Sequence, residues 1–373
     1  MDIIERILLL PMCGLGDAVC YLPFLREMRS RNPEARITAV VVSEVAKTIL
    51  ESAGCSIEII VFNRSGEQAG WKALANLLRR IRRGRFQVAF SGAHPNSVRV
   101  PLFAAISGAK LRVGASMERY SFLYNRKVNV RTDAHAHERF RRLLTAVGIE
   151  VAEGGYRPHF TVSPDAMAGA LSLWKNAGLK EGDKVVGFAS GADSNARGPW
   201  KPYLKRWRAE RYGEIANWLR SEAGVRVVMF GGPEESVLAE QISSASNTPI
   251  VSFCGETGVH ELAWLVSKCK AIVSNDTGVM HVSAAVGTPV IALFGPTSPD
   301  SFGPIGEKHR IVQGTIHCSP CYPFPTCDLS GCGAMDEISA DRVIACLSDV
   351  LNPKNAGRTD SIANNELVQI RGK

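Results

Sequence analysis

The strongest constraint in this sequence is a repeated alternation of short apolar, β-branched segments with helical ones. Residues 6–11 have the pattern of a strand, 17–31 that of a helix and 36–42 that of a second strand, with Gly14-Leu15-Gly16 at the first turn. This βαβ unit pairs its strands in parallel. The alternation continues with strands expected at 57–62 and 86–91, and helices at 71–82 and 136–147. The first half therefore predicts a doubly wound parallel sheet.

A second series of the same kind begins after a break in the pattern. Residues 153–165 contain Gly154-Gly155, Pro158 and Pro164, which indicate a domain boundary. The strands expected beyond the break are 184–189, 225–230, 250–253, 271–274 and 290–294. At about 150 residues per domain, 373 residues suffice for two domains.

We therefore expect an α/β fold with two Rossmann-like, doubly wound parallel-sheet domains, residues 1–160 and 161–350. Two such domains in sequence imply a cleft between them, where ligands of open parallel sheets bind. Residues 351–373 are polar, contain Pro353 and Gly357, and are expected to form a disordered tail.

The composition predicts a soluble, cytoplasmic protein. Hydrophobic residues make up 45% of the chain and the mean hydropathy is -0.01, which is typical of a globular protein. No run approaches the roughly 18 apolar residues of a membrane-spanning helix. Because residues 1–11 have no basic region before their short apolar run, they predict a strand rather than a signal peptide. The ten cysteines are then expected to stay reduced.

The positive charge favours an anionic partner. Lys and Arg number 44 against 36 Asp and Glu, a net charge of +8 with a pI near 9.0. The run from Arg79 to Arg85 is either a solvated helix face or a surface that attracts an anionic acceptor or the inner leaflet of a membrane. We expect Arg79 and Arg83 to contact the acceptor. Nucleic acid is disfavoured because no interleaved aromatic residues accompany the run.

The most informative motif is Ser274-Asn275-Asp276-Thr277-Gly278-Val279-Met280-His281. A strand ends at Ser274 and a helix begins near Thr277, so the free amides of residues 278–280 suit a diphosphate. Taken alone, Asp276 and Thr277 are equally typical of helix caps, and His281 of a packed helix residue. A second loop, 295–297, follows the next strand, and the combination favours a ligand site.

These residues resemble a known family, the ADP-heptose:lipopolysaccharide heptosyltransferases (glycosyltransferase family 9), which have the GT-B fold. The resemblance rests on the Asn275-Asp276-Thr277-Gly278-x-x-His281 run, on 294–297, on Gly231-Gly232-Pro233-Glu234-Glu235, on the turn at 16–19 and on Lys205-Arg206-Trp207, and it spans residues from about 6 to 345. It implies an inverting glycosyltransferase that moves heptose from ADP-heptose to a hydroxyl of the lipopolysaccharide inner core. The acceptor is then an anionic glycolipid, with possible peripheral contact at the inner membrane, and catalysis requires no cofactor.

The resemblance also implies residue roles. Asp276 would meet the heptose hydroxyls, and Lys205 would offset phosphate charge as ADP leaves, with Lys201 as the alternative because the connection before Lys205 is long. The donor site would comprise Lys205, Asp276, Thr277, Gly278, His281, Gly231, Gly295, Pro296 and Thr297. Asp17 would be the general base, with Gly16 beside it on the acceptor side; the alternative is that Asp17 caps its helix.

Four cysteines, Cys318, Cys321, Cys327 and Cys332, fall within fifteen positions. Thiols at such spacing form tetrahedral metal sites, so the cluster indicates either a structural Zn or Fe site or reduced loop thiols. In the autotransporter-modifying heptosyltransferases, a stretch at this place resembles an iron-binding finger.

Two alternative functions keep the same fold. One is a heptosyltransferase acting on a protein or small-molecule acceptor, which a metal at the cysteine cluster would favour. The other is a non-catalytic nucleotide-sugar-binding or nucleic-acid-binding protein. Asp17 and Asp276 argue against the second, because a binding protein needs no carboxylate on the acceptor side.

Overall fold

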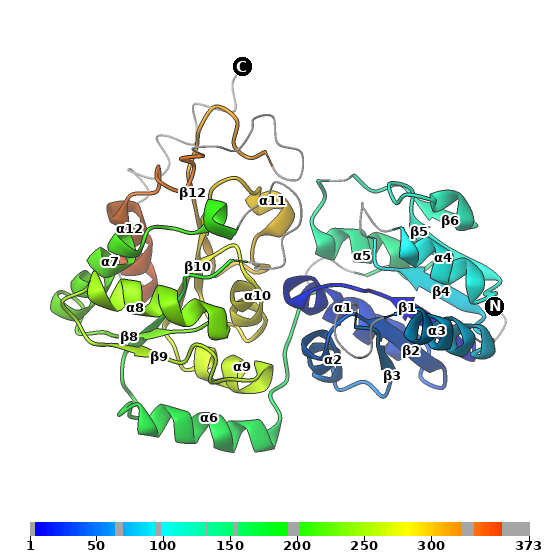
Figure 1. The fold of residues 1–373 in the computed structure, drawn as a ribbon, viewed down its shortest axis with the longest axis horizontal. Coiled ribbons are helices and arrows are strands. Elements are labelled where there is room, and N and C mark those ends of the chain that lie inside the picture. The colour runs from blue at the N-terminus through cyan, green and yellow to red at the C-terminus, as the bar shows by residue number, and fades with distance from the viewer. Residues whose placement is uncertain are drawn as a thin grey trace. The chain divides into compact units, whose positions relative to one another are not determined.

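The computed structural model describes residues 4–63, 70–93, 98–131, 133–151, 156–192, 202–321 and 332–352. The chain forms two compact units (Figure 1). The first contains Met1–Ser163 with Asp300–Phe302, and the second contains Pro164–Pro299 with Gly303–Lys373. The sequence placed this division after residue 160. The expected tail, 351–373, lies almost wholly outside the described residues.

The first unit is built on a six-stranded parallel sheet of order β3-β2-β1-β4-β5-β6. The strands are β1 (Arg6–Leu10), β2 (Arg36–Val41), β3 (Glu58–Val61), β4 (Val88–Ser91), β5 (Leu111–Ala115) and β6 (Arg126–Val128). The helical elements are α1 (Leu15–Arg31), α2 (Glu44–Glu51), α3 (Trp71–Arg83), α4 (Arg99–Ile106), the 3-10 helix η1 (Ser121–Leu123) and α5 (Ala136–Thr145).

Helices cover both faces of this sheet. Successive side chains of a strand point to opposite faces, and in β4 Ala89 joins the apolar cluster of α3 and α4, while Phe90 contacts Phe24 of α1 at 5.4 Å between ring centroids. On the α1 side, α1 contacts α2 and α5. The central strands are thus buried on both faces, which is why they read as continuous apolar runs rather than as alternating ones.

The second unit repeats this plan with the strand order β12-β11-β10-β7-β8-β9, again parallel. Its strands are β7 (Val185–Ala189), β8 (Arg226–Met229), β9 (Ile250–Ser252), β10 (Ala271–Asn275), β11 (Val290–Phe294) and β12 (Arg310–Gln313). The longer helices are α6 (Pro164–Asn176), α7 (Ala209–Ser221), α8 (Ser236–Ser244), α9 (Val259–Ser267), α10 (Gly278–Ala285) and α12 (Ala340–Leu351). Short helical turns are η3 (Pro202–Lys205), η4 (Pro233–Glu235) and α11 (Pro299–Phe302).

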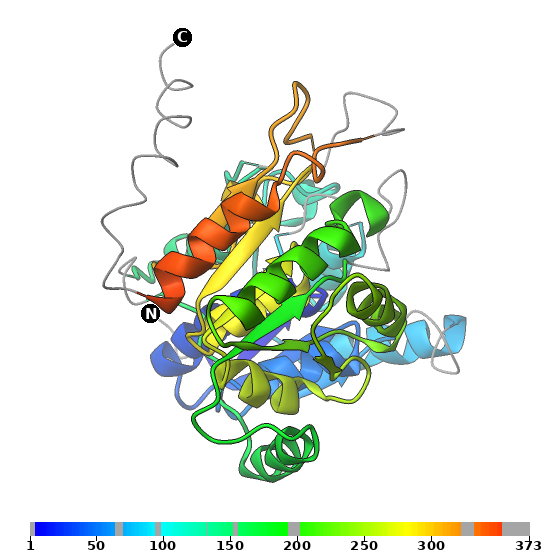
Figure 2. The same cartoon turned by 90° about the vertical axis from the view of Figure 1, so that its left-hand side faces the viewer.

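Figure 2 shows α12 and α7 side by side along this second sheet, and the two helices contact each other. Together with α8 they cover an apolar cluster that includes Phe188, Tyr212 and Leu347. α9 contacts both α6 and α10.

The expected fold class is confirmed: two doubly wound, parallel six-stranded sheets. The sequence did not predict β5, β6 or β12. β6 and β12 have three and four residues and lie at sheet edges, and all three strands carry a charged residue, Arg112, Lys127 or Arg310. In the described part of the chain, no helix is long and apolar enough to cross a membrane.

Candidate functional site

The end of β10 is held in place by a buried amide. Asn275 is fully buried, and its side-chain nitrogen donates to the carbonyl of Ser190, after β7, at 2.7 Å. The Tyr212 hydroxyl of α7 donates to the Asn275 side-chain oxygen at 3.1 Å. Because the ends of β10 and β7 and the helix α7 are joined through one side chain, the loop that follows β10 starts from a fixed position.

Asp276, the next residue, forms an ion pair with Lys205. The Lys205 Nζ atom lies 2.8 Å from Asp276 Oδ2, and the two side chains are 17% and 10% exposed. Lys205 ends η3, which thus brings the ammonium group to the carboxyl edge of the second sheet. The alternative phosphate ligand, Lys201, lies outside the described residues.

The helix α10 begins directly after this pair. Thr277 occupies the N-cap position in an extended conformation, and its hydroxyl makes no capping hydrogen bond. The amides of Gly278, Val279 and Met280 form the first turn. Such a turn suits an anionic group. His281 lies one position further along the same helix, so the structure brings five of the predicted donor residues, Lys205, Asp276, Thr277, Gly278 and His281, to one edge of the sheet.

Two buried hydroxyl groups lie at the ends of the strands beside β10. Ser190 follows β7 and Thr297 follows β11, and they are 3% and 1% exposed. Neither hydroxyl has a hydrogen-bond partner among the described residues. Because buried polar groups in native proteins are almost always paired, both are poised to bond a ligand or water at this edge. Sequence reasoning missed Ser190, and its only signal was its place after a strand.

Three other predicted donor residues have structural roles of their own. A Cβ atom on Gly295 would lie 2.7 Å from the Met335 sulfur, and one on Gly231 would lie 2.7 Å from the Glu235 Cβ atom, so close packing explains both glycines. The carbonyl of Pro296 accepts a hydrogen bond from the Cys321 amide at 2.9 Å. Their contact with a donor stays a prediction.

In the first unit, Asp17 lies in the first turn of α1, just beyond the carboxyl end of β1, with Gly16 before it. The N-cap is Gly14, so Asp17 is not the capping residue itself. Burial raises the pKa of the Cys13 and Cys20 thiols, and the neighbouring Asp17 carboxylate raises both further. The two cysteines are therefore neutral packing residues rather than nucleophiles.

Comparison with known proteins identifies the family. The model of glycosyltransferase family 9 (heptosyltransferase) matches residues 74–326, more than half of the chain. The chain belongs to glycosyltransferase family 9.

A solved member from Veillonella parvula, described as a glycosyltransferase of family 9, superimposes with a TM-score of 0.76 at 22% identity, covering 94% of this chain and 98% of its own. The Escherichia coli ADP-heptose lps heptosyltransferase II superimposes with a TM-score of 0.71 at 25% identity, covering 94% and 100%. A lipooligosaccharide heptosyltransferase 2 of Haemophilus influenzae is 34% identical over 162 residues, 42% of this chain and 44% of its own. The matched region thus spans less than half of that curated relative.

A glutamate of the Gly231–Glu235 motif is buried in this family 9 chain. Glu235 is 8% exposed, and its carboxylate accepts a hydrogen bond from the Gly232 amide at 2.6 Å. Burial raises the pKa of Glu235 despite that hydrogen bond. The Glu235 side chain therefore caps the start of η4 from within the same motif.

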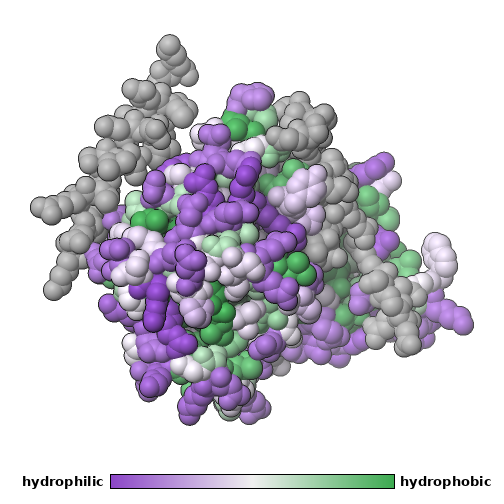
Figure 3. Space-filling model, turned by 60° about the vertical axis from the view of Figure 1, so that its left-hand side comes forward, coloured by the Kyte–Doolittle hydropathy of each residue, from purple (hydrophilic) through white to green (hydrophobic). Residues whose placement is uncertain are grey.

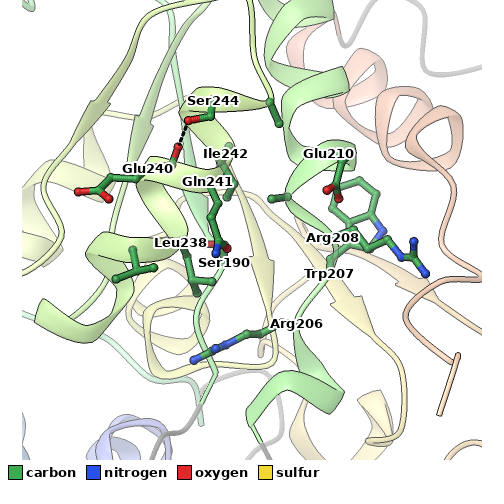
Figure 4. A pocket seen from close by; sticks show the side chains of 13 residues that line it. Ser190, Arg206, Trp207, Arg208, Glu210, Leu238, Glu240, Gln241, Ile242 and Ser244 are labelled. Carbon is green, nitrogen blue, oxygen red and sulfur yellow. Dashed lines mark hydrogen bonds between the residues drawn. The ribbon is translucent and has the colours of Figure 1, made fainter. Parts of the chain in front are cut away.

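A groove of about 930 Å³ runs between α7 and α8 in the second unit (Figure 4). Arg206 and Gln241 line it together with Ser190, and the Ser244 hydroxyl donates to the Glu240 carbonyl along α8 at 2.9 Å. None of the residues predicted for the donor site lines this groove. Ser190 is the residue that it shares with the carboxyl edge of the sheet.

The predicted acceptor residues of this family 9 chain do not come together. Gly16 lies at the carboxyl edge of the first sheet, whereas Arg79 and Arg83 lie near the end of α3. Both arginines line a 420 Å³ pocket with Arg6 and Arg36, the first residues of β1 and β2, and so lie at the opposite, amino edge. A helix that connects parallel strands runs back along the sheet, so its last turn ends at that edge. Gly16 and the two arginines therefore lie at opposite edges of the first sheet, and their contact with an acceptor stays a prediction.

Glu58, at the start of β3, is the acidic residue of that arginine pocket. It pairs with Arg80 at 2.6 Å and with Arg36 at 2.9 Å. The hydrogen bond from Arg80 is the main reason that the pKa of Glu58 lies below its usual value. The pocket therefore keeps a large positive excess.

The cysteine cluster lies only partly in the described chain. Cys318, Cys321 and Cys332 are half-buried or buried thiols, and Cys327 lies outside the described residues. Among the residues that the structure describes, no group of three or more His, Cys, Asp or Glu side chains is placed to hold a metal ion. The four-cysteine metal site therefore has no support from the described residues.

Proposed function

We propose that this chain is an inverting heptosyltransferase that transfers heptose from ADP-heptose to a hydroxyl of the lipopolysaccharide inner core. Membership of family 9 supports the proposal, as do relatives that are named lipopolysaccharide or lipooligosaccharide heptosyltransferases. The observation that carries it is the Lys205–Asp276 pair beside the first turn of α10. A cation, a carboxylate and free helix amides are the groups that a sugar diphosphate requires.

In this proposal the second unit holds the donor. The first-turn amides of α10 and the Lys205 ammonium group bind the diphosphate, with Thr277, Gly278 and His281 around it. Asp276 accepts hydrogen bonds from heptose hydroxyls. As ADP leaves, its diphosphate gains negative charge, and Lys205 with the helix amides stabilises that charge where it develops. Because these groups stabilise the negative charge of the leaving diphosphate, we propose that catalysis requires no metal ion.

The first unit then supplies the base. The acceptor oxygen bonds to C1 of the heptose as the bond from C1 to the diphosphate oxygen breaks. The hydroxyl proton passes to the Asp17 carboxylate, and the electron pair of the broken bond leaves with ADP. Attack from the face opposite the leaving group inverts the anomeric centre. Gly16, beside Asp17 in the first turn of α1, lies on the acceptor side in this proposal.

The acceptor is a glycolipid, so the reaction takes place at the cytoplasmic face of a membrane with the protein in peripheral contact. Arg79 and Arg83, at the other edge of the first sheet, then act on the anionic surroundings of the acceptor rather than on the reacting hydroxyl.

Calorimetric titration with ADP-heptose, ADP and UDP tests the donor assignment. We expect ADP-heptose and ADP to bind and UDP to bind at least about tenfold more weakly, because the site must read the base. Asp276→Asn should weaken ADP-heptose binding more than ADP binding, since Asp276 faces the sugar. If the variant bound ADP-heptose and ADP with equally reduced affinity, the assignment of a sugar contact to Asp276 would be contradicted.

A further inference from the structure

The positive charge of the chain is concentrated in one stretch of the first unit. Residues 70–131 contain thirteen Lys and Arg residues and one acidic residue, Glu118, which is buried. The rest of the chain then has 31 basic and 35 acidic residues, from totals of 44 and 36. Attraction to an anionic partner is therefore a property of this stretch and not of the whole molecule.

The helices of this stretch, α3 and α4, pack in one apolar cluster on the first sheet, and its strands β4, β5 and β6 belong to the sheet itself. α3 contacts α4, and α4 contacts η1. Figure 1 shows α3, α4 and β6 in the same part of the unit. The Arg82 guanidinium lies directly against Gly108, just after α4, so the basic end of α3 borders α4. We call the outer surface of α3, α4 and η1 the α3–α4 face.

Large apolar side chains are exposed on the same face. Val98, Leu102 and Ile106 follow one another at intervals of four residues along α4, which places them in one outward stripe. Phe122 of η1 is 70% exposed, and its ring packs edge-on against the Tyr120 ring at 6.0 Å. These and Trp71, which begins α3, make up six of the twelve exposed large apolar residues in the described chain.

The second unit differs. In the view of Figure 3, which faces that unit, hydrophilic side chains dominate and apolar ones form small separate spots. Among its described residues, the exposed large apolar side chains are spread over four elements, α6, η3, α8 and β12. The apolar stripe of the α3–α4 face is thus a local feature of this chain.

Several cations of the α3–α4 face are available to a partner. Arg82 of α3 and Arg99 of α4 are exposed, and neither makes a hydrogen bond or an ion pair within the part of the chain that the structure describes. The Arg119 guanidinium stacks over the Tyr120 ring at 5.6 Å. Protein surfaces that lie in the headgroup region of a bilayer typically combine cationic side chains with an adjacent stripe of aliphatic and aromatic ones.

We propose that the α3–α4 face docks on a bilayer containing anionic phospholipids. Leu102, Ile106 and Phe122 enter the boundary between headgroups and acyl chains, while the flanking arginines bind lipid phosphates. An aliphatic stripe has no counterpart on nucleic acid, and the lack of exposed acidic residues matches a uniformly anionic surface. The inference deepens the proposed function, because a lipid-anchored acceptor would be presented at that surface.

Vesicle flotation with the full chain tests the proposal directly and requires no catalytic activity. We expect binding to vesicles of phosphatidylcholine mixed with phosphatidylglycerol, little binding to phosphatidylcholine alone, and loss of binding at high salt. Arg82→Glu with Arg99→Glu should weaken binding at least about tenfold. Phe122→Ser and Leu102→Gln should each weaken it several-fold, by roughly three- to tenfold.

Two matched controls lie in the second unit. Leu171 of α6 is 39% exposed, close to the 42% of Leu102, so Leu171→Gln should leave binding unchanged. Arg220→Glu makes the same charge change at an exposed site of α7 and is the control for the single variant Arg82→Glu. It should leave vesicle binding unchanged. Equal losses in variants and controls, or equal binding to both kinds of vesicle, would overturn the proposal. So would tighter binding of the wild type to a short DNA duplex than to the mixed vesicles.

The same variants separate this inference from the proposed function. With a deacylated, water-soluble acceptor, ADP release by Arg82→Glu/Arg99→Glu should equal that of the wild type. Vesicle binding without any ADP release would contradict the heptosyltransferase proposal alone. ADP release without vesicle binding would contradict the docking surface alone.

Discussion

Lys205 and Asp276 form an ion pair, with Nζ 2.8 Å from Oδ2 and both side chains largely buried. In the proposed reaction, one partner serves the diphosphate and the other the sugar. Because an ammonium group has three N–H donors and a carboxylate has several acceptor sites, the pair can hold both groups in position while each also contacts the donor.

Removing one partner of this pair leaves a charge that is mostly buried. Lys205→Met and Asp276→Asn should each lower the free energy of unfolding by about 1–3 kcal/mol. The double variant should be less destabilised than the two single losses combined, because no charge is left unpaired. Urea denaturation measures all three. Additive losses would show that the pair contributes nothing to stability.

The contribution of the Tyr212–Asn275 hydrogen bond to stability can be measured by removing the Tyr212 hydroxyl. Tyr212→Phe leaves the buried Asn275 oxygen without its donor and should cost about 1–2 kcal/mol of unfolding free energy, with weaker donor binding. Tyr203→Phe is the matched control, because Tyr203 is 64% exposed. An equal effect of both variants would mean that the bond does not position the end of β10.

Two glycine substitutions should have opposite effects on stability. A Cβ atom on Gly314 would lie 1.7 Å from the Ala334 carbonyl oxygen, so Gly314→Ala should destabilise the chain by about 3 kcal/mol or more. Gly169 lies inside α6, where the nearest atoms to an added Cβ are 4.0 Å away. Gly169→Ala should therefore stabilise by about 0.5–1 kcal/mol. Thermal unfolding of both variants checks the pair.

Lowering the pH should reduce the stability of the second unit, because His309 is half-buried there. Burial is the main reason that the His309 pKa lies below its usual 6.5. Its Nδ1 accepts from the Val290 amide at 3.2 Å, a bond that exists only for the neutral ring. As pH falls below about 6.5, the unfolded chain takes up a proton that the folded chain resists, so stability falls until the lower folded pKa is passed.

In the His309→Asn variant, the Asn Oδ1 atom can accept the hydrogen bond that Nδ1 of His309 accepts, but the side chain does not titrate. Its unfolding free energy should fall less than that of the wild type between about pH 7 and pH 5. Chemical denaturation at several pH values gives the comparison, and parallel curves for the two proteins would assign the acid sensitivity to other groups.

Much of the fold could be predicted because its central strands are buried on both faces. Continuous apolar runs such as 290–294 read as strands without any tertiary information. β6, with the sequence Arg-Lys-Val, could not be predicted, because an edge strand of three residues is formed by its partner β5 and not by its own apolar pattern.

The site was less predictable than the fold. Lys205 and Asp276 are 71 positions apart, and only the family resemblance pointed to both. The separation of Gly16 from Arg79 and Arg83 was not drawn from the sequence, although a signal for it existed. A helix between parallel strands must end at the amino edge, which separates the end of α3 from the carboxyl edge where Gly16 lies. Ser190 and Thr297 are significant because their buried hydroxyls have no partner among the residues that the structure describes, and no sequence pattern records this.

The most direct test of the central claim is ADP release from ADP-heptose, measured with and without Kdo-lipid A or heptosylated core, by the wild type and by Asp17→Asn. We predict release that requires an acceptor and falls by at least about a hundredfold in the variant, because a general base contributes on that scale. Glu222→Gln, in the second unit, is the matched carboxylate control and should match the wild type. Full release by Asp17→Asn would contradict the base assignment, and measurable donor binding with no release on either acceptor would contradict transfer to the lipopolysaccharide core.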